Sequence, residues 1–211
     1  MKKLIVVVLT FTLFACQSAY YAAWEKLGVE KRDILVDRVE DAKDSQEDAQ
    51  KQFASALDEF SQLINFDGGE LQAVYEDLSS QFEASQDAAS TVTNRIDKVE
   101  SVAEALFDEW TAELDKYSNA NLRRDSQKQL RETQRRYNSL ISAMRKAESK
   151  MAPVLSALQD NVLYLKHNLN ANAVGALQGE FNAIKKDIDQ MIKEMNTAIA
   201  ESNEFISTIK S

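Results

Sequence analysis

Apolar and small side chains recur in alternating steps of three and four residues along most of the chain. The last part of the chain shows this most regularly, in eleven positions: Val174, Leu177, Phe181, Ile184, Ile188, Met191, Met195, Ala198, Ser202, Phe205 and Ile209. A second run of the same kind extends from Leu71 to Tyr117. Such spacing places one stripe of side chains on one face of a helix and forms the seam of coiled coils. The pattern therefore predicts long, paired helices.

Four such runs predict four long helices, over residues 20–64, 70–117, 123–169 and 173–210. Polar or glycine-containing stretches separate them and predict turns near residues 65–69, 118–121 and 168–172. Each of the first three helices would be about 70 Å long at 1.5 Å per residue. Because short connections make consecutive helices antiparallel, we expect an all-α fold. Its architecture would be an elongated antiparallel bundle of about four long helices with coiled-coil-like heptad packing.

Proline and the turn positions refine this expectation. Pro153 lies inside the third run, where it removes a backbone donor and clashes with the preceding turn. We expect a kink near residues 148–152, and the alternative is two separate helices. If the first turn centres near residue 67, residue i of the first helix faces residue 134 − i of the second. Residues 42–49 then face residues 85–92, and both stretches are small enough for close approach.

The start of the chain has the pattern of an export signal. Lys2 and Lys3 precede a mostly apolar stretch, residues 4–14, which is too short to span a bilayer. Ala15 and Cys16 follow, in an order that resembles the lipobox of bacterial lipoproteins. We therefore expect residues 1–15 to be a lipoprotein signal peptide and Cys16 to anchor the chain in the lipid bilayer through acyl groups.

The same stretch leaves two alternatives open, an ordinary secretory signal with an incidental cysteine and a cytoplasmic protein with an apolar start. Gln17 follows the cysteine, and by resemblance to the sorting rule of Gram-negative lipoproteins it points to the outer membrane. Residues 16–211 are expected to form a single helical rod domain. Within it, residues 16–29 would be a tether and the start of the first helix.

Charge and composition narrow the classes of partner. The 211 residues carry a formal net charge of −9, with five glycines, one proline and one cysteine. An acidic chain is a poor general ligand for nucleic acid, so we expect no nucleic-acid partner. Residues 30–118 carry 8 basic and 23 acidic side chains, whereas residues 123–150 carry 9 basic and 3 acidic ones. We expect these two blocks to neutralise each other across neighbouring helices.

The expected bundle puts one group of cations at the same end as the lipid anchor. They are Lys116, Arg123, Arg124, Lys128 and Arg131. The fourth predicted helix stops before it covers this end, which leaves the end of the second helix and the start of the third partly uncovered. A basic tip beside anionic headgroups gains about 1 kcal/mol per cation at low salt. The alternative is that these cations pair with the acidic first and second helices.

No catalytic constellation is present, and we expect a protein that is not an enzyme. A single histidine and a single cysteine exclude His- and Cys-rich metal sites, and no phosphate-binding glycine motif occurs. We expect neither a cofactor nor a metal. His167 lies near the end of a predicted helix, where we expect it to cap the helix; partner contact and metal or haem ligation are the alternatives. The methionines on the apolar stripes are expected to fill the core.

Several strings resemble a known family. They are residues 31–39 (KRDILVDRV), the aromatic residues between 20 and 28, residues 153–155, and residues 163–171 (LYLKHNLNA). Together they resemble the proteobacterial family known as domain of unknown function 2959, over essentially the whole chain after the signal. The resemblance implies a secreted, lipoprotein-like helical protein with no assigned activity. A label mentioning DNA-repair ATPases, attached to some relatives, finds no support in this sequence.

The expected function is that of a periplasm-facing outer-membrane lipoprotein acting as a scaffold, spacer or adaptor for an unidentified envelope protein. Self-association into a homo-oligomer is also possible along the helical seam. From the resemblance and their polarity, we expect six residues to contact the partner: Lys31, Arg32, Asp33, His167, Asn168 and Asn170. One alternative is a holdase or carrier for apolar cargo, with an open groove lined by Phe53, Phe60, Phe82 and Phe181. Two others are an enzyme and a cytoplasmic coiled coil that works on DNA.

Overall fold

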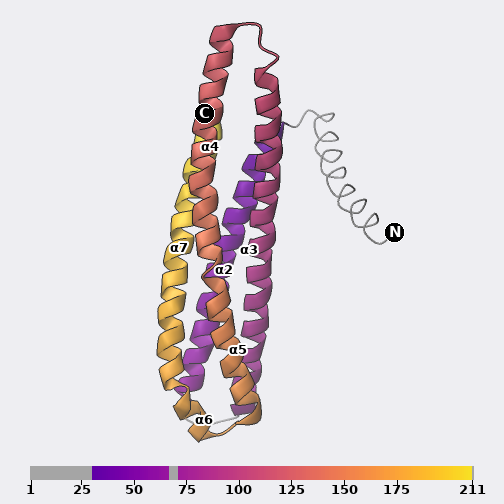
Figure 1. Cartoon of the computed structure of the whole chain (residues 1–211). Helices are drawn as coiled ribbons and strands as arrows, with labels where there is room; N and C mark the ends of the chain where they lie inside the picture. Colours follow the sequence, from indigo (N-terminus) through magenta and orange to yellow (C-terminus); the bar gives the residue numbers. More distant parts are fainter. Residues whose placement is uncertain (1–29, 67–70, 211) are drawn as a thin grey trace, which may run out of the picture.

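A computed structural model describes residues 30–66 and 71–210, and within these ranges the regular structure is entirely helical (Figure 1). The all-α expectation is confirmed for this part of the chain. The signal peptide, the acyl anchor at Cys16 and the tether at residues 16–29 lie outside it. The described helices are α2 (Lys31–Ile64), α3 (Leu71–Leu114), α4 (Ala120–Glu148), α5 (Met151–His167), α6 (Ala171–Ala176) and α7 (Gln178–Lys210).

The helices form an elongated bundle (Figure 1). Helix α2 packs against α3 and α7, and the successive helices α4 and α5 pack against the same two. The "α3–α4 end" of the bundle contains the connection between those helices, the start of α2 and the end of α7. The "α5–α6 end" contains the turn after α5, the end of α2 and the start of α7. Helices α3 and α4 extend beyond α2 and α7 at the α3–α4 end (Figure 1).

A continuous apolar core runs along the bundle, and its residues recur in the steps that the sequence predicts. In α3 the buried positions are Leu78, Phe82, Ser85, Ala89, Val92, Ile96, Val99, Ala103, Leu106 and Leu114, with Val102 beside them. In α7 they are Ile184, Ile188, Met191, Met195, Ala198, Ser202 and Phe205. The methionines at 144, 151, 191 and 195 are all buried, as expected for core-filling residues. Burial of this stripe is the main force that holds the long helices together.

The expected register of the first two helices is confirmed. The side-chain amide of Gln52 on α2 donates to the Gln81 side chain on α3 over 2.8 Å. Nearer the start of α2, Arg95 donates to Asp41 over 2.8 Å. Both pairs lie within two residues of the predicted relation, in which residue i faces 134 − i.

The middle of the bundle contains the small residues that the register predicted. Ala42 and Ala49 are fully buried, and Ser85 on α3 is buried beside Ala89. Gln46 lies between the two α2 alanines and is also fully buried, yet neither its amide nitrogen nor its oxygen has a hydrogen-bond partner. An unpaired buried carboxamide is costly, because it loses its water without gaining a protein partner.

The third predicted helix is two helices, which is the alternative that the sequence left open. Helix α4 ends at Glu148 and α5 begins at Met151. The amide of Ser149 still bonds to the carbonyl of Arg145, but that of Lys150 bonds to Ala147, so the last turn tightens. Pro153 is then the third residue of α5, within the first turn, where a missing N–H leaves no intrahelical bond unmade.

The fourth predicted helix also differs from its expectation, because it is interrupted at Leu177. The six-residue α6 begins two residues before the predicted start, and α7 follows after Leu177. The side chain of Asn170 caps α6 by accepting from the Ala173 amide over 3.1 Å. Gly175 and Gly179 flank the interruption and weaken the helix there, since glycine has a low helix propensity. The spacing of the apolar residues alone does not reveal this loss of helix propensity.

Candidate functional site

A groove with a volume of about 670 Å³ lies at the α3–α4 end of the bundle. Residues from the start of α2, the last turns of α3, the middle of α4 and the end of α7 line it. Its apolar lining consists of Leu106, Trp110, Phe205 and Ile209. Leu106 and Phe205 are buried core residues, so the groove is a shallow continuation of the core. It forms because α2 and α7 end below the top of α3 and α4 (Figure 1).

Charges of both signs surround this apolar lining. The carboxylates are Glu30, Glu109, Glu113 and Glu132, and the cations are Lys31, Arg32 and Arg136. Lys31 Nζ lies 3.1 Å from Glu109 Oε2, and the Lys31 side chain is only 11% exposed. Arg136 donates to the Thr208 hydroxyl and thereby joins α4 to α7. A ligand that fits this groove would present an apolar face with both acidic and basic groups at its edges.

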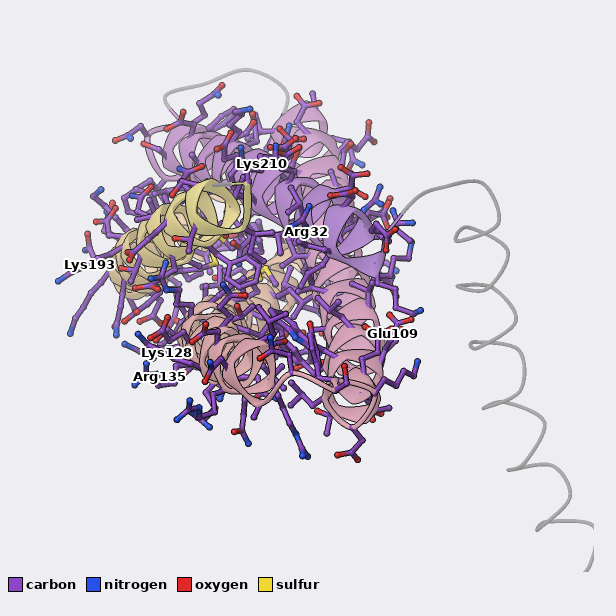
Figure 2. The ribbon with its side chains drawn as sticks, turned by 90° about the horizontal axis from the view of Figure 1, so that it is seen from above. Arg32, Glu109, Lys128, Arg135, Lys193 and Lys210 are labelled. Atoms are coloured by element: carbon purple, nitrogen blue, oxygen red, sulfur yellow. The ribbon has the colours of Figure 1, made fainter. Side chains whose placement is uncertain are left out.

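Figure 2 looks along the bundle from the α3–α4 end. Glu109 lies on α3, whereas Lys128 and Arg135 project from the side of α4 away from α3 (Figure 2). Lys210 lies near the end of α7, where its ammonium pairs with Glu40 of α2 over 2.8 Å. The Lys31–Glu109 and Lys210–Glu40 pairs therefore join α2 to α3 and to α7 at this end of the bundle.

The five cations of the predicted basic tip all lie at the α3–α4 end, and several have partners. Arg123 Nη2 lies 2.7 Å from Asp115, and Lys116 lies 3.6 Å from Glu113. Lys128 lies 4.0 Å from Glu132. Arg124 donates to the side chain of Asn121, and Arg131 is exposed. The structure therefore brings these residues together, while local acidic or polar groups engage four of them.

The predicted partner-binding residues do not form one surface, because they lie at opposite ends of the bundle. Lys31 and Arg32 line the groove at the α3–α4 end, and the exposed Asp33 follows them. His167, Asn168 and Asn170 lie at the α5–α6 end. The predicted antiparallel bundle implies this separation, since it places the start of the first helix and the end of the third at opposite ends.

At the α5–α6 end, two of the three predicted polar residues have structural roles. Asn168 donates from its side chain to the Tyr164 carbonyl over 2.9 Å and closes the end of α5. Asn170 caps α6. His167 is exposed in the last turn of α5, next to Lys166, a position where a positive charge suits the helix dipole.

Two exposed apolar side chains accompany His167, and sequence reasoning missed them. Leu163 is 50% exposed and Tyr164 is 41% exposed, both near the end of α5. The signal was available, because both residues fall off the stripe that Leu158, Val162 and Leu165 bury. Neighbouring exposed apolar residues of this size indicate a contact surface more often than scattered single ones do.

The phenylalanine-lined groove of the carrier hypothesis is not formed. Phe53 and Phe60 are fully buried, and Phe82 is 8% exposed. Phe181 packs its ring edge-on against Phe60, with ring centres 5.6 Å apart. Three of these side chains belong to the packed interior, and Phe181 is partly buried against it, so they do not line an open groove.

The expected pairing of acidic and basic blocks is confirmed at Arg145. Its guanidinium bonds to Glu100 of α3 through two nitrogens, lies 2.6 Å from Asp97, and lies 2.8 Å from Glu148. The hydrogen bonds to Glu100, followed by those to the other carboxylates, raise the pKa of Arg145 above its ordinary value. This cluster joins α3 to the end of α4.

Tyr137 lies beside the same cluster. Its ring stacks edge-on against Phe107, with centres 5.4 Å apart, and approaches Phe205 of α7. Burial, with a smaller contribution from the Glu100 charge, raises the pKa of Tyr137 to about 12. The phenol is therefore a neutral packing residue between α3, α4 and α7 at physiological pH.

Residues 30–66 and 71–210 contain no group of three or more His, Cys, Asp or Glu side chains arranged to hold a metal ion. No helix in these ranges is both long and apolar enough to cross a bilayer.

Comparison with known proteins gives a family without an assigned activity. No curated protein matches the chain. A family model described as "Protein of unknown function (DUF2959)" matches residues 20–209, nearly the whole chain. This agrees with the resemblance carried by residues 31–39 and 163–171. The chain therefore belongs to the DUF2959 family.

Proposed function

We propose that this protein is a lipid-anchored scaffold, spacer or adaptor of the cell envelope that acts by binding and not by catalysis. One end, attached through acylated Cys16, would stand on the outer membrane. The other end would reach into the periplasm and contact an envelope protein.

The observation that carries this proposal is the separation of two candidate surfaces along the bundle. The described chain begins at Glu30, at the same end as the basic residues of the predicted tip. The exposed Leu163 and Tyr164 lie at the opposite end. The 44 residues of α3 measure about 66 Å at 1.5 Å per residue, so the two surfaces are far apart. A molecule with this distribution suits a spacer between a membrane and a partner.

The finer architecture belongs to the same proposal. Four helical columns, with α4 and α5 acting as one column kinked ahead of Pro153, would pack through a heptad seam. Support comes from α7, where every successive buried position follows by three or four residues in alternation. A column of this kind resists bending, which a spacer requires.

At the membrane end, charge would orient the bundle. Each Lys or Arg near an anionic surface contributes about 1 kcal/mol, and this contribution falls off within a Debye length. Arg123 and Lys116 already pair with carboxylates, so their contribution would be smaller. Arg131 and Arg124, which no carboxylate engages in the contacts described above, would contribute most.

At the partner end, Leu163, Tyr164 and His167 would form the contact. A tyrosine and a leucine side by side supply apolar area, and the imidazole supplies a polar edge. Asn168 and Asn170 would act indirectly, since their side chains close α5 and cap α6. The partner is expected to be a protein, because the acidic chain repels nucleic acid. A second copy of this chain is the alternative partner.

The apolar-carrier alternative has less support. Three of the four phenylalanines that it needs are part of the packed core, and Phe181 packs against that core. Binding of an apolar dye to the folded protein would support the carrier alternative.

The test is site-specific photo-crosslinking in cells that express the full chain. A photoreactive residue at position 163 is expected to give a defined crosslinked product in the envelope fraction. The same residue at Lys193, an exposed position on α7, is the matched control and is expected to give none. The product should disappear when Cys16→Ser removes the anchor. No product at position 163, or equal products at 163 and 193, would overturn the assignment of the partner end.

A further inference from the structure

The groove at the α3–α4 end opens where the preceding part of the chain enters the bundle. Helix α2 begins at Lys31 and α7 ends at Lys210, while α3 and α4 continue beyond both (Figure 1). Glu30, the first described residue, itself lines the groove. The residues that precede Glu30 in the chain are therefore held close to this apolar groove by their covalent connection to it.

The register of α2 against α3 shows how far that preceding segment would reach. Gln52 pairs with Gln81, and Lys31 pairs with Glu109. Going back along α2 from Gln52 to Lys31 thus moves forward along α3 from Gln81 to Glu109. Ten residues before Glu30, at about 1.5 Å each, would reach from Glu109 past Leu114. This is the stretch of α3 that has no α2 beside it.

The side chains of that segment match the groove. Tyr20, Trp24 and Leu27 follow one another in steps of four and three residues. Positions at these spacings share one helical face. Glu30 has an extended backbone and α2 begins after it, and Lys31 is largely buried and turned toward Glu109, so the chain enters the bundle beside α3. The groove offers an apolar floor of Leu106, Trp110 and Phe205 with charges at its edge.

We propose that this groove is the docking site of the chain's own residues 20–29, with Tyr20, Trp24 and Leu27 against its floor. These residues lie outside the described part of the chain. The family match begins at residue 20, so it includes this segment in the same domain as the helices. Docking would cover the part of α3 that α2 leaves uncovered and would remove the apolar groove lining from water.

Docking has a consequence for the anchor, and this consequence alone rests on the proposed function. Only residues 17–19 would then separate Cys16 from the domain. Three extended residues span about 10 Å, which is about a Debye length at physiological salt. The basic residues at this end would stand within range of the headgroups.

Crosslinking between two engineered cysteines tests the docking. The full chain carries Cys16→Ser, so that the engineered pair holds its only thiols, together with Leu27→Cys and Glu113→Cys. A short bis-maleimide is expected to join this pair at least tenfold more efficiently than the control pair, Leu27→Cys with Ser156→Cys on α5. Equal yields from the two pairs would overturn the proposal. Because Cys16 is replaced, the outcome does not depend on acylation.

A second set of variants separates docking from mere closeness in sequence. Ile209→Arg or Ile209→Glu places a charge in the groove and is expected to lower the crosslinking yield at least fivefold. Leu163→Arg, at the α5–α6 end, is the matched control and should leave the yield unchanged. Helical circular dichroism and the melting temperature establish that each variant folds. A yield that neither Ile209 variant lowers would contradict docking in the groove.

Discussion

The indole N–H of Trp110 donates a hydrogen bond of 2.8 Å to the hydroxyl of Ser126, and this contact joins α3 to α4 beside the groove. Ser126 is 8% exposed, so its hydroxyl depends on this partner. The bond lies at the level where α2 begins, below the part of α3 and α4 that extends alone. It therefore secures the hairpin that forms two walls of the groove.

Ser126→Ala is expected to lower the free energy of unfolding by about 1 kcal/mol, the net value of one such bond. Ser139→Ala, at an exposed position on the same helix, is the control and should change it by less than about 0.5 kcal/mol. Urea unfolding followed by circular dichroism measures both. Equal effects would show that the Trp110–Ser126 contact contributes nothing specific.

Gln46 is expected to reduce the stability of the bundle. Its carboxamide is fully buried without a partner, so Gln46→Leu removes a desolvated polar group and keeps similar volume. The free energy of unfolding should rise by about 1–3 kcal/mol. Gln50→Leu is the matched control on the same helix, and it should be destabilising because Gln50 donates to Asn196 and to the Ile192 carbonyl. A loss of stability in Gln46→Leu would mean that the carboxamide is satisfied in solution.

The Arg145 cluster is expected to stabilise the contact between α3 and α4 more than a surface ion pair does. Arg145→Met removes the partner of Asp97, Glu100 and Glu148 and should cost about 1–2 kcal/mol at low salt, after allowance for solvent screening. Lys146→Met, which breaks a single pair with Glu194, should cost less than about 1 kcal/mol. Thermal unfolding at low and high salt distinguishes the two, and equal losses would contradict the cluster's role.

The raised pKa of Tyr137 predicts how the free energy of unfolding changes at alkaline pH. Its pKa is about 12 in the folded chain and 10.0 in the reference state, so the unfolded chain loses its phenolic proton first. Stability from this residue is complete below pH 10 and declines as the pH rises from about 10 to 12. Tyr137→Phe should reduce the slope of stability against pH in this range. An unchanged slope, or a Tyr137 phenolate that forms near pH 10 in the folded protein, would contradict the burial of the phenol.

The helical pattern predicted the fold class and the pairing of the first two helices, because both depend on which face of each helix is apolar. Gln52 and Gln81 meet within two residues of the predicted register. The pattern did not predict the interruption at Leu177, because a buried leucine maintains the apolar spacing while Gly175 and Gly179 weaken the backbone. The position of Pro153 predicted a kink, with two separate helices as the alternative, and the structure has two helices.

The candidate site was harder to predict from sequence, because it depends on where helices end. The uncovered end of α3 and α4 followed from the predicted lengths, and the structure has a groove there. Lys31 and His167 were both expected to contact the partner, but they lie at opposite ends of the bundle. The apolar spacing did not predict Leu163 and Tyr164 as a surface, because they lie beside the buried stripe and not on it.

The central claim is that the bundle stands on a membrane through Cys16, and its most direct test compares wild type with Cys16→Ser. Membrane fractionation and intact mass are measured on both proteins, expressed as the full chain. The account predicts that wild type begins at Cys16, carries the added mass of acyl chains and sediments with the outer membrane, while the variant loses both properties. A wild-type chain that retains Met1 and remains in the cytosol would contradict the anchor, the location and the spacer function together.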